Sequence, residues 1–142
     1  MSQQMLCVKE KYYMKNMDEA NILLQKANDD FTALSNMIDD EVFSDGIFGF
    51  HMLQTIEKSV KAWLAFLKIR YPKTHNINSL LQLVEQNGYD ISPYDDFIEY
   101  SIYAVQYRYD QYDGTGQSLD RHECIRQVSV LLNHVDRIII EN

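Results

Sequence analysis

Apolar residues recur along the chain at the spacing of amphipathic helices. Over residues 15–37 they lie three and four positions apart, which is the spacing of one helix face. The same pattern predicts four more helices, over residues 44–71, 77–87, 93–112 and 118–140. Glycine and proline are scarce (Gly 5, Pro 2), which argues against a turn-rich β-sandwich or barrel. The sequence therefore predicts an all-α protein.

Residues typical of helix ends set the boundaries of these helices. Ser44 is an N-cap residue for the second helix, and Pro72 ends it, because proline disfavours helix at the preceding residue. Gly88 suits the C-terminal end of the third helix, and Ser92-Pro93 predicts the start of the fourth. Because the connections are short, we expect an up-and-down antiparallel four-helix bundle with an additional short helix, five helices in all. We expect one domain, residues 1–142, with residues 1–14 irregular or disordered.

The predicted fourth helix has two apolar faces. At 100° per residue, one face carries Ile98, Ile102, Val105 and Tyr109, and the nearly opposite face carries three tyrosines, namely Tyr100, Tyr103 and Tyr107. A surface helix needs only one apolar face. This pattern favours a central helix or one that meets a partner subunit, with the three tyrosines at a dimer interface. The alternative is that these tyrosines simply close the core of the monomer.

Composition limits the compartment and the chemistry of the protein. Cys7 and Cys124 are the only cysteines, which is typical of a reducing compartment. No apolar run resembles a signal peptide or a membrane span, so we expect a cytoplasmic protein without a membrane partner. None of the four histidines has a carboxylate three residues before it, and glycine-rich nucleotide loops and nucleophile motifs are absent. We expect no metal site and no cofactor.

Charge singles out one segment of an acidic chain, whose formal net charge is −8. Lys58 to His75 contains no acid, and a strip at helical spacing runs His51, Gln54, Lys58, Lys61, Ala65 and Lys68. Glu57 lies four residues before Lys61 and could pair with it. The strip is either a solvated helix face or a groove in which Lys58 and Lys61 bind phosphate of a nucleotide or RNA.

Arg70 and His75 lie at the end of this strip, with four residues between them. A metal-independent ribonuclease could use such a pair. Histidine would move the 2′-hydroxyl proton, and arginine would stabilise the charged phosphorane. Arg70 and His75 are therefore the candidate catalytic residues.

Three segments of the sequence resemble the HEPN domain family. Phe50 to Ala62 resembles the family's "QQAVEKALKA" helix, and Lys73-Thr74-His75-Asn76-Ile77 with Leu80-Leu81 resembles its "THDL..LL" segment. Tyr103 to Asp110, ending Tyr107-Arg108-Tyr109-Asp110, resembles its "Y…RYPD" segment. The resemblance extends over about residues 45–140 and implies an antiparallel helical bundle that is usually dimeric.

The resemblance also implies a function. It points to a dimeric nucleotide- or RNA-binding module that acts with a minimal nucleotidyltransferase partner, its antitoxin, in a toxin–antitoxin or defence setting. Arg108 and Tyr109 join the nucleotide- or RNA-binding residues, although Arg108 could also form a buried pair. The family's ribonucleases carry Arg, four to six residues and His on a late helix, whereas here only Arg70 and His75 have that spacing. His75 is thus either catalytic, or it caps or orients the third helix. An endoribonuclease toxin and a purely structural interaction protein are the alternatives.

Overall fold

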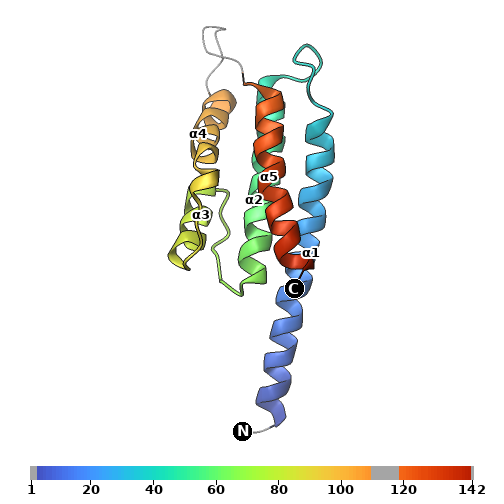
Figure 1. Ribbon diagram of the computed structural model, residues 1–142, viewed down its shortest axis with the longest axis vertical. Coiled ribbons are helices and arrows are strands. Elements are labelled where there is room, and N and C mark those ends of the chain that lie inside the picture. Colours follow the sequence, from blue (N-terminus) through green and yellow to red (C-terminus); the bar gives the residue numbers. More distant parts are fainter. Residues whose placement is uncertain (1–2, 110–118, 142) are drawn as a thin grey trace.

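The computed structural model describes the backbone of residues 3–109 and 119–141 and the side chains of residues 17–102 and 119–141. Within these ranges the chain forms five α-helices, one 3₁₀ helix and no β-strand, so the predicted all-α fold is confirmed. The long helices alternate in direction, and the short α3 lies beside α4 (Figure 1). The elements are α1 (Gln3–Ser35), α2 (Asp45–Phe66), α3 (Ile77–Gln86), η1 (Ser92–Tyr94), α4 (Asp96–Tyr109) and α5 (Arg121–Ile140).

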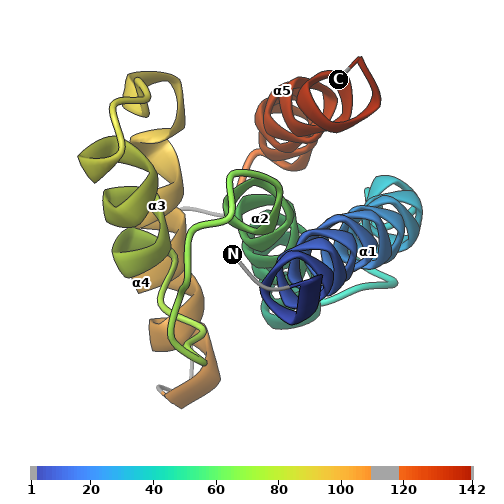
Figure 2. The same ribbon diagram turned by 90° about the horizontal axis from the view of Figure 1, so that it is seen from below.

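The second helix is the centre of the molecule. α2 packs against each of the other four α-helices, with α1 and α5 on one side and α3 and α4 on the other (Figure 2). Its polar residues Thr55 and Ser59 are fully buried. Their hydroxyls donate to the carbonyl oxygens of His51 and Thr55, at 2.9 and 2.7 Å, which satisfies them without a partner from another helix. The central position that the two-faced pattern favoured for the fourth helix belongs to α2.

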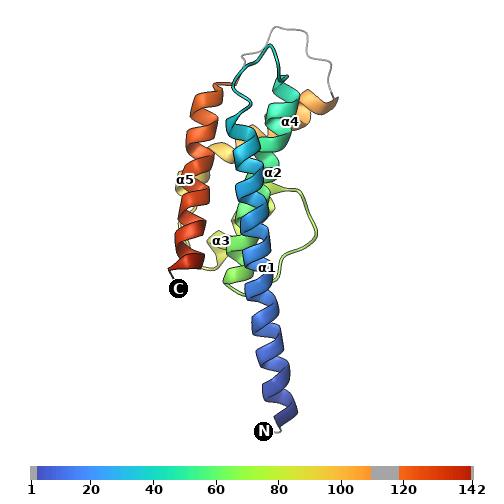
Figure 3. The same cartoon turned by 90° about the vertical axis from the view of Figure 1, so that its right-hand side faces the viewer.

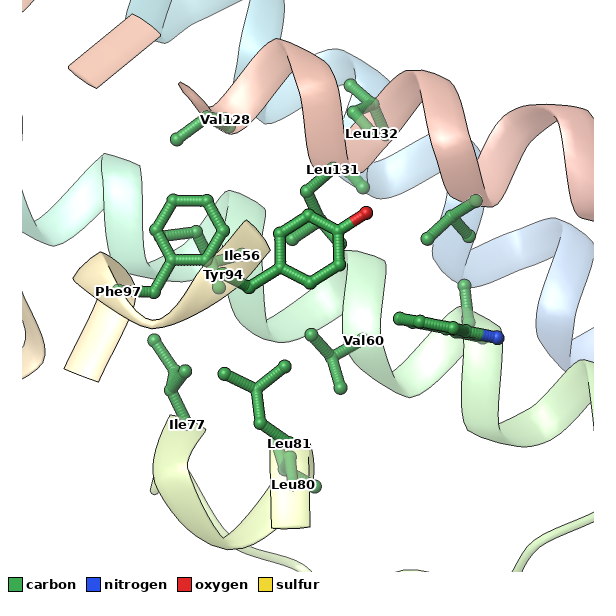
Figure 4. Packing of buried hydrophobic residues seen from close by; sticks show 14 of the residues in the cluster. Ile56, Val60, Ile77, Leu80, Leu81, Tyr94, Phe97, Val128, Leu131 and Leu132 are labelled. Atoms are coloured by element: carbon green, nitrogen blue, oxygen red, sulfur yellow. The ribbon is translucent and has the colours of Figure 1, made fainter. Parts of the chain in front are cut away.

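The core lies between α2 and the helices on both of its sides. Apolar side chains of α2 meet those of α3, of α5, of η1 and of the start of α4 in the close view (Figure 4). Fully buried apolar groups stabilise the fold by about 1.5–3 kcal/mol each. The labelled residues are Ile56, Val60, Ile77, Leu80, Leu81, Tyr94, Phe97, Val128, Leu131 and Leu132.

Two of the predicted helix boundaries are confirmed. Ser44 is the N-cap of α2, and its hydroxyl accepts a hydrogen bond from the amide of Ile47 at 3.3 Å. Gly88 follows α3 with φ of 93°, in the left-handed region that favours glycine. The amides of Gly88 and Tyr89 donate back into the last turn of α3, which is the arrangement of a Schellman motif.

The prediction that Pro72 ends the second helix is wrong. α2 ends at Phe66, and Lys68 takes up a left-handed conformation with φ of 61°. The amide of Lys68 donates to Ala65 O at 3.0 Å, and that of Ile69 donates to Leu64 O at 2.9 Å. This is the same Schellman motif that ends α3, with lysine where glycine is usual. The residues from 67 to 76 therefore form a loop and not the last turn of a helix.

Three helix starts also differ from the prediction. Ser92 does not cap the fourth helix, because Ser92–Tyr94 forms a 3₁₀ turn and α4 begins only at Asp96. The side chain of Asp90 accepts a hydrogen bond from the amide of Ser92, which sets up this turn. α5 begins at Arg121, capped by Asp120, three residues later than predicted. α1 is helical from Gln3 and so includes most of the segment expected to be irregular.

Candidate functional site

The basic face of α2 is largely neutralised by acids. Lys58 forms an ion pair with Asp30 of α1, and Lys61 Nζ lies 3.7 Å from Glu57 Oε2, the pairing that the four-residue spacing predicts. Ala65, in the same strip, is buried. Two of the expected phosphate-binding lysines are therefore held in ion pairs at half-buried positions. The groove expected along this helix face is not present as an open basic surface.

A group of exposed cations lies in the α2–α3 loop, residues 67–76. Lys68, Arg70 and Lys73 are exposed, whereas Ile69 and Tyr71 are half-buried and pack against the core. The sequence of the loop contains no acid. In an extended chain, successive side chains point alternately inward and outward, as they do in this loop. A helix continuing to Pro72 would have oriented the cations differently.

Tyr71 fixes the middle of the α2–α3 loop. Its hydroxyl donates a hydrogen bond of 2.6 Å to Glu19 Oε1 on α1. Burial, followed by the contact with Glu19, raises the pKa of Tyr71 well above its usual range, so the hydroxyl stays protonated and remains a donor. Lys61 Nζ lies 5.9 Å from the centroid of the Tyr71 ring, within the range of a cation–π contact. The loop is thus attached to both α1 and α2.

His75 fixes the end of the same loop. Its Nδ1 lies 2.7 Å from Glu57 Oε1. The Glu57 side chain is only 8% exposed, whereas the His75 side chain is 88% exposed. A carboxylate on Nδ1 orients an imidazole and selects the tautomer whose Nε2 can accept a proton. His75 does not cap the third helix, because Asn76 does so by accepting a hydrogen bond from the amide of Ser79 at 3.1 Å.

A second charged cluster, at the start of α5, could not be predicted from the sequence. Arg121 is buried, and its Nη2 lies 2.7 Å from Asp45 Oδ1. The guanidinium also donates to the carbonyl oxygens of Met37 and Phe43, at 2.7 and 2.6 Å, and lies over the ring of Phe48. Arg121 thereby ties α5 to the turn between α1 and α2. Its partners lie more than 70 positions away in the sequence, so no local pattern indicates them.

A third polar contact links η1 with α5. Tyr94 Oη and His134 Nδ1 are 2.6 Å apart, and the centroid of the His134 ring lies 5.0 Å from that of buried Trp63. Burial, followed by the charge of Arg137, lowers the pKa of His134, which favours the neutral form of the ring. A neutral Nδ1 can accept the proton of the Tyr94 hydroxyl.

The remaining predicted site residues lie on α4. Tyr100 is half-buried and packs against the core, with its ring 6.4 Å from that of Phe97. Burial raises the pKa of Tyr100 well above its usual range. The side chains of Tyr103, Tyr107, Arg108 and Tyr109 lie outside the described residues, so their predicted roles stay predictions.

The described residues form neither a metal-binding cluster nor a membrane-spanning helix. No group of three or more histidine, cysteine, aspartate or glutamate side chains there is arranged so that it could hold a metal ion. No helix in that part of the chain combines the length and apolar character needed to cross a membrane.

Comparison with known proteins identifies the family. The family model of the HEPN domain matches residues 20–138, which is most of the chain. The chain belongs to the HEPN domain family. No curated protein and no solved structure matches it. HEPN membership points to a nucleotide- or RNA-binding module or a ribonuclease. The α2–α3 loop, with Arg70 and His75, lies inside the matched range, whereas residues 3–19 of α1 lie outside it.

Proposed function

We propose that this HEPN protein is a nucleotide- or RNA-binding module that contacts phosphate through its α2–α3 loop. The observation that supports this proposal is the anchored geometry of the loop. Tyr71 and His75 attach it to acids on α1 and α2, and Lys68, Arg70 and Lys73 are exposed between or beside these anchors. Cations held on a fixed backbone bind phosphate at a lower entropic cost than cations on a freely moving segment. An acidic molecule of net charge −8 repels nucleic acid elsewhere.

The binding proposal revises the roles of the lysines on α2. Lys58 and Lys61 are paired with Asp30 and Glu57, so they shape the site rather than supply most of its charge. Arg108 and Tyr109 remain proposed contributors from α4. Affinity should then depend on the loop cations and should fall steeply with salt, because phosphate binding releases counterions.

The binding proposal can be tested by fluorescence anisotropy with a labelled short single-stranded RNA and with a nucleoside triphosphate, at several salt concentrations. The double variant Arg70→Ala/Lys73→Ala should bind at least about tenfold more weakly, and its salt slope should fall by about 0.7 for each lost contact. Lys26→Ala removes an exposed lysine from α1 and is the matched control. Binding of neither probe by the wild type at low salt, or equal losses in the double variant and the control, would exclude the loop as the site.

A metal-independent endoribonuclease is a second candidate, favoured by the contact between Glu57 and His75. His75 Nε2 would take the proton from a 2′-hydroxyl, and the 2′-oxygen would attack the adjacent phosphorus. The bond from phosphorus to the 5′-oxygen would break, and water would protonate that oxygen. Arg70 would stabilise the charged phosphorane. Cleavage of RNA in EDTA by the wild type, lost in His75→Ala, would support this candidate. RNA that stays intact with both the wild type and His75→Ala would exclude the endoribonuclease.

We also propose, from the family, that the protein is a homodimer and acts with a minimal nucleotidyltransferase as antitoxin in a toxin–antitoxin or defence setting. An adjacent small nucleotidyltransferase gene, and co-purification of the two products, would support this setting. If co-expressed protein purifies without that partner, the setting is wrong, although phosphate binding by the loop could still hold.

A further inference from the structure

The turn between α1 and α2 is held from within by a buried arginine. Arg121, at the start of α5, donates hydrogen bonds to the carbonyl oxygens of Met37 and Phe43, at 2.7 and 2.6 Å. Its Nη2 also lies 2.7 Å from Asp45 Oδ1, in the first turn of α2. The backbone from residue 37 to residue 45 is therefore fixed at both ends, although most of its side chains are exposed. A turn that is ordered in advance loses little conformational entropy when a partner docks on it.

Aliphatic side chains are exposed on this turn and on the first turn of α2. The most exposed of them is that of Val42, at 67%. Single exposed apolar residues are ordinary, but several within one short segment, beside charged residues, mark a surface on which another protein binds. The exposed aliphatic residues of this segment are Ile38, Val42 and Ile47.

Acidic residues surround these aliphatic side chains. Residues 38–47 contain four acids and no lysine or arginine, and Asp120 lies beside them at the start of α5. We call residues 38–47 and 119–122 together the acidic end. Figure 3 shows this turn and the start of α5 side by side at one end of the bundle. Because Arg121 is buried, the exposed surface of the acidic end is negative.

The fold accounts for three of the five acids. Asp45 pairs with the buried arginine, and Asp120 caps α5. Asp39 accepts a hydrogen bond from the amide of Glu41 at 2.9 Å, within the turn itself. The carboxylates of Asp40 and Glu41 are exposed, and no ion pair among the described residues involves either of them. These two acids are thus placed to attract a basic partner.

A cavity of about 270 Å³ opens among the acids. It is smaller than the roughly 300–1,000 Å³ of sites that enclose small molecules, so it suits one long side chain of a docked protein better than a free ligand. Its lining combines aliphatic Ile38 and Leu119 with the carboxylates of Asp40 and Asp120. Arginine has an aliphatic stem and a guanidinium that binds carboxylates in a bidentate manner, so it matches both parts of this lining. Arg121, which also lines the cavity, is already paired within the protein.

We propose that the acidic end binds a basic amphipathic segment of a different protein. An arginine of that segment enters the cavity beside Asp40 and Asp120, and its aliphatic side chains cover Val42 and Ile47. Nucleic acid does not fit this surface, because both carry negative charge.

This partner surface is separate from the proposed phosphate site. The α2–α3 loop begins at the other end of α2, and 22 helical residues separate the two ends by about 33 Å (Figure 3). The partner and a nucleotide or RNA can therefore be bound at the same time. Neither proposal depends on the other.

The proposal can be tested by selecting binders to the whole protein from a random-peptide library, with the variant Asp40→Lys/Glu41→Lys for counter-selection. Selected peptides should carry arginine or lysine close to aliphatic residues. In fluorescence anisotropy, a labelled selected peptide should bind this double variant at least about tenfold more weakly than the wild type. Val42→Ser, which changes no charge, should also weaken binding about tenfold. In an NMR titration, the amide shifts should be concentrated in residues 38–47 and 119–122.

A matched charge change elsewhere separates a specific site from general attraction to an acidic protein. Asp29→Lys/Glu85→Lys alters the net charge by the same amount at exposed positions on α1 and α3. This control should bind the peptide like the wild type, and circular dichroism should show that all variants keep their helices. Equal losses in the two double variants would overturn the proposal, as would selected peptides without basic residues or a selection that yields no binder. It would also be overturned if Val42→Ser bound as tightly as the wild type, because a purely electrostatic contact, such as that of a polyamine, does not need the aliphatic side chain.

Discussion

The cluster of Arg121 with Asp45 and the cluster of Glu57 with His75 each contain a buried charged side chain, but they differ in what they expose to solvent. Arg121 pairs with Asp45, and its side chain is only 5% exposed, so its hydrogen bonds are closed within the protein. Glu57 pairs with His75 and is just as buried, but the imidazole it holds is in solvent. In the first cluster the guanidinium donates to oxygens of the protein itself, whereas in the second the imidazole faces solvent. Burial of both partners indicates a structural role, and burial of one partner leaves a group that can act on a ligand.

Removing Arg121 should have the largest effect on stability. Arg121→Met fills similar volume but removes the guanidinium that donates to Asp45 and to the carbonyl oxygens of Met37 and Phe43. Breaking a buried pair in this way costs about 3–5 kcal/mol. Urea unfolding followed by circular dichroism measures the loss. Arg126→Met is the matched control, because Arg126 pairs with Glu123 on the surface, where solvent screens an ion pair and its contribution to stability is small. Equal losses for the two variants would show that Arg121 is not a structural clamp.

Substitutions of Glu57 and His75 should have unequal effects. Glu57→Leu leaves the half-buried Lys61 without its acid and releases His75, which we expect to cost about 2–3 kcal/mol. His75→Ala removes an exposed ring, and Glu57 keeps Lys61, so we expect a loss below about 1 kcal/mol. The same urea experiment compares the two. If His75→Ala is as damaging as Glu57→Leu, the imidazole is structural and the contrast with the Arg121 cluster disappears.

The helices and the contacts within one helix could be predicted from the sequence, but the contacts between helices could not. Spacing of apolar residues predicts all five helices, and Ser44 and Gly88 mark their boundaries correctly. The pair of Glu57 with Lys61 follows from a spacing of four residues. Lys58 and Asp30 lie 28 positions apart, on different helices, so their ion pair appears only after the helices pack. The sequence therefore indicates a basic strip without revealing the acids that neutralise it.

The end of α2 shows why a boundary can be missed. A left-handed residue after a helix is usually glycine, as at Gly88, because a side chain strains that conformation. Lys68 takes up the same left-handed conformation, but a lysine does not mark a helix end in a sequence. Pro72 is therefore the first residue in the sequence that predicts the end of α2. The consequence reaches the candidate site, because the shorter helix places Arg70 in the α2–α3 loop, together with His75.

Glycine exchanges at these two positions should change stability by smaller amounts and in opposite directions. Lys68→Gly relieves the left-handed strain and should stabilise the protein by about 0.5–1 kcal/mol. Gly88→Ala should destabilise it by about 1 kcal/mol, and a Cβ there meets no atom within 4 Å, so only the backbone conformation contributes. Thermal unfolding compares the two variants. A destabilised Lys68→Gly would show that contacts of the lysine outweigh its strain, and the α2–α3 loop would then depend on Lys68 for its shape.

The His134 side chain is half-buried, so its exposure lies between that of Arg121 and that of His75. Its substitution should have the smallest effect on stability, and this effect should be seen only when the pH is varied. Its pKa in the folded protein is lowered from 6.5, chiefly by burial and further by Arg137. Below pH 6.5 the unfolded chain therefore binds a proton that the folded protein resists, so stability falls as pH decreases through this window. Above pH 6.5 the imidazole is mostly neutral in both states, so the folded protein keeps this stability in full. Protonation would also prevent Nδ1 from accepting the proton of Tyr94.

The pH dependence separates an enclosed imidazole from an exposed one. In His134→Gln this part of the dependence should be absent, since glutamine does not titrate, whereas His75→Ala should retain it. Urea unfolding of the wild type and both variants at pH 5 and pH 7.5 measures the difference. If wild type and His134→Gln lose the same stability on acidification, the ring is not protected from protonation by the fold. Burial would then not distinguish the histidine beside Trp63 and Tyr94 from the one that Glu57 presents to solvent.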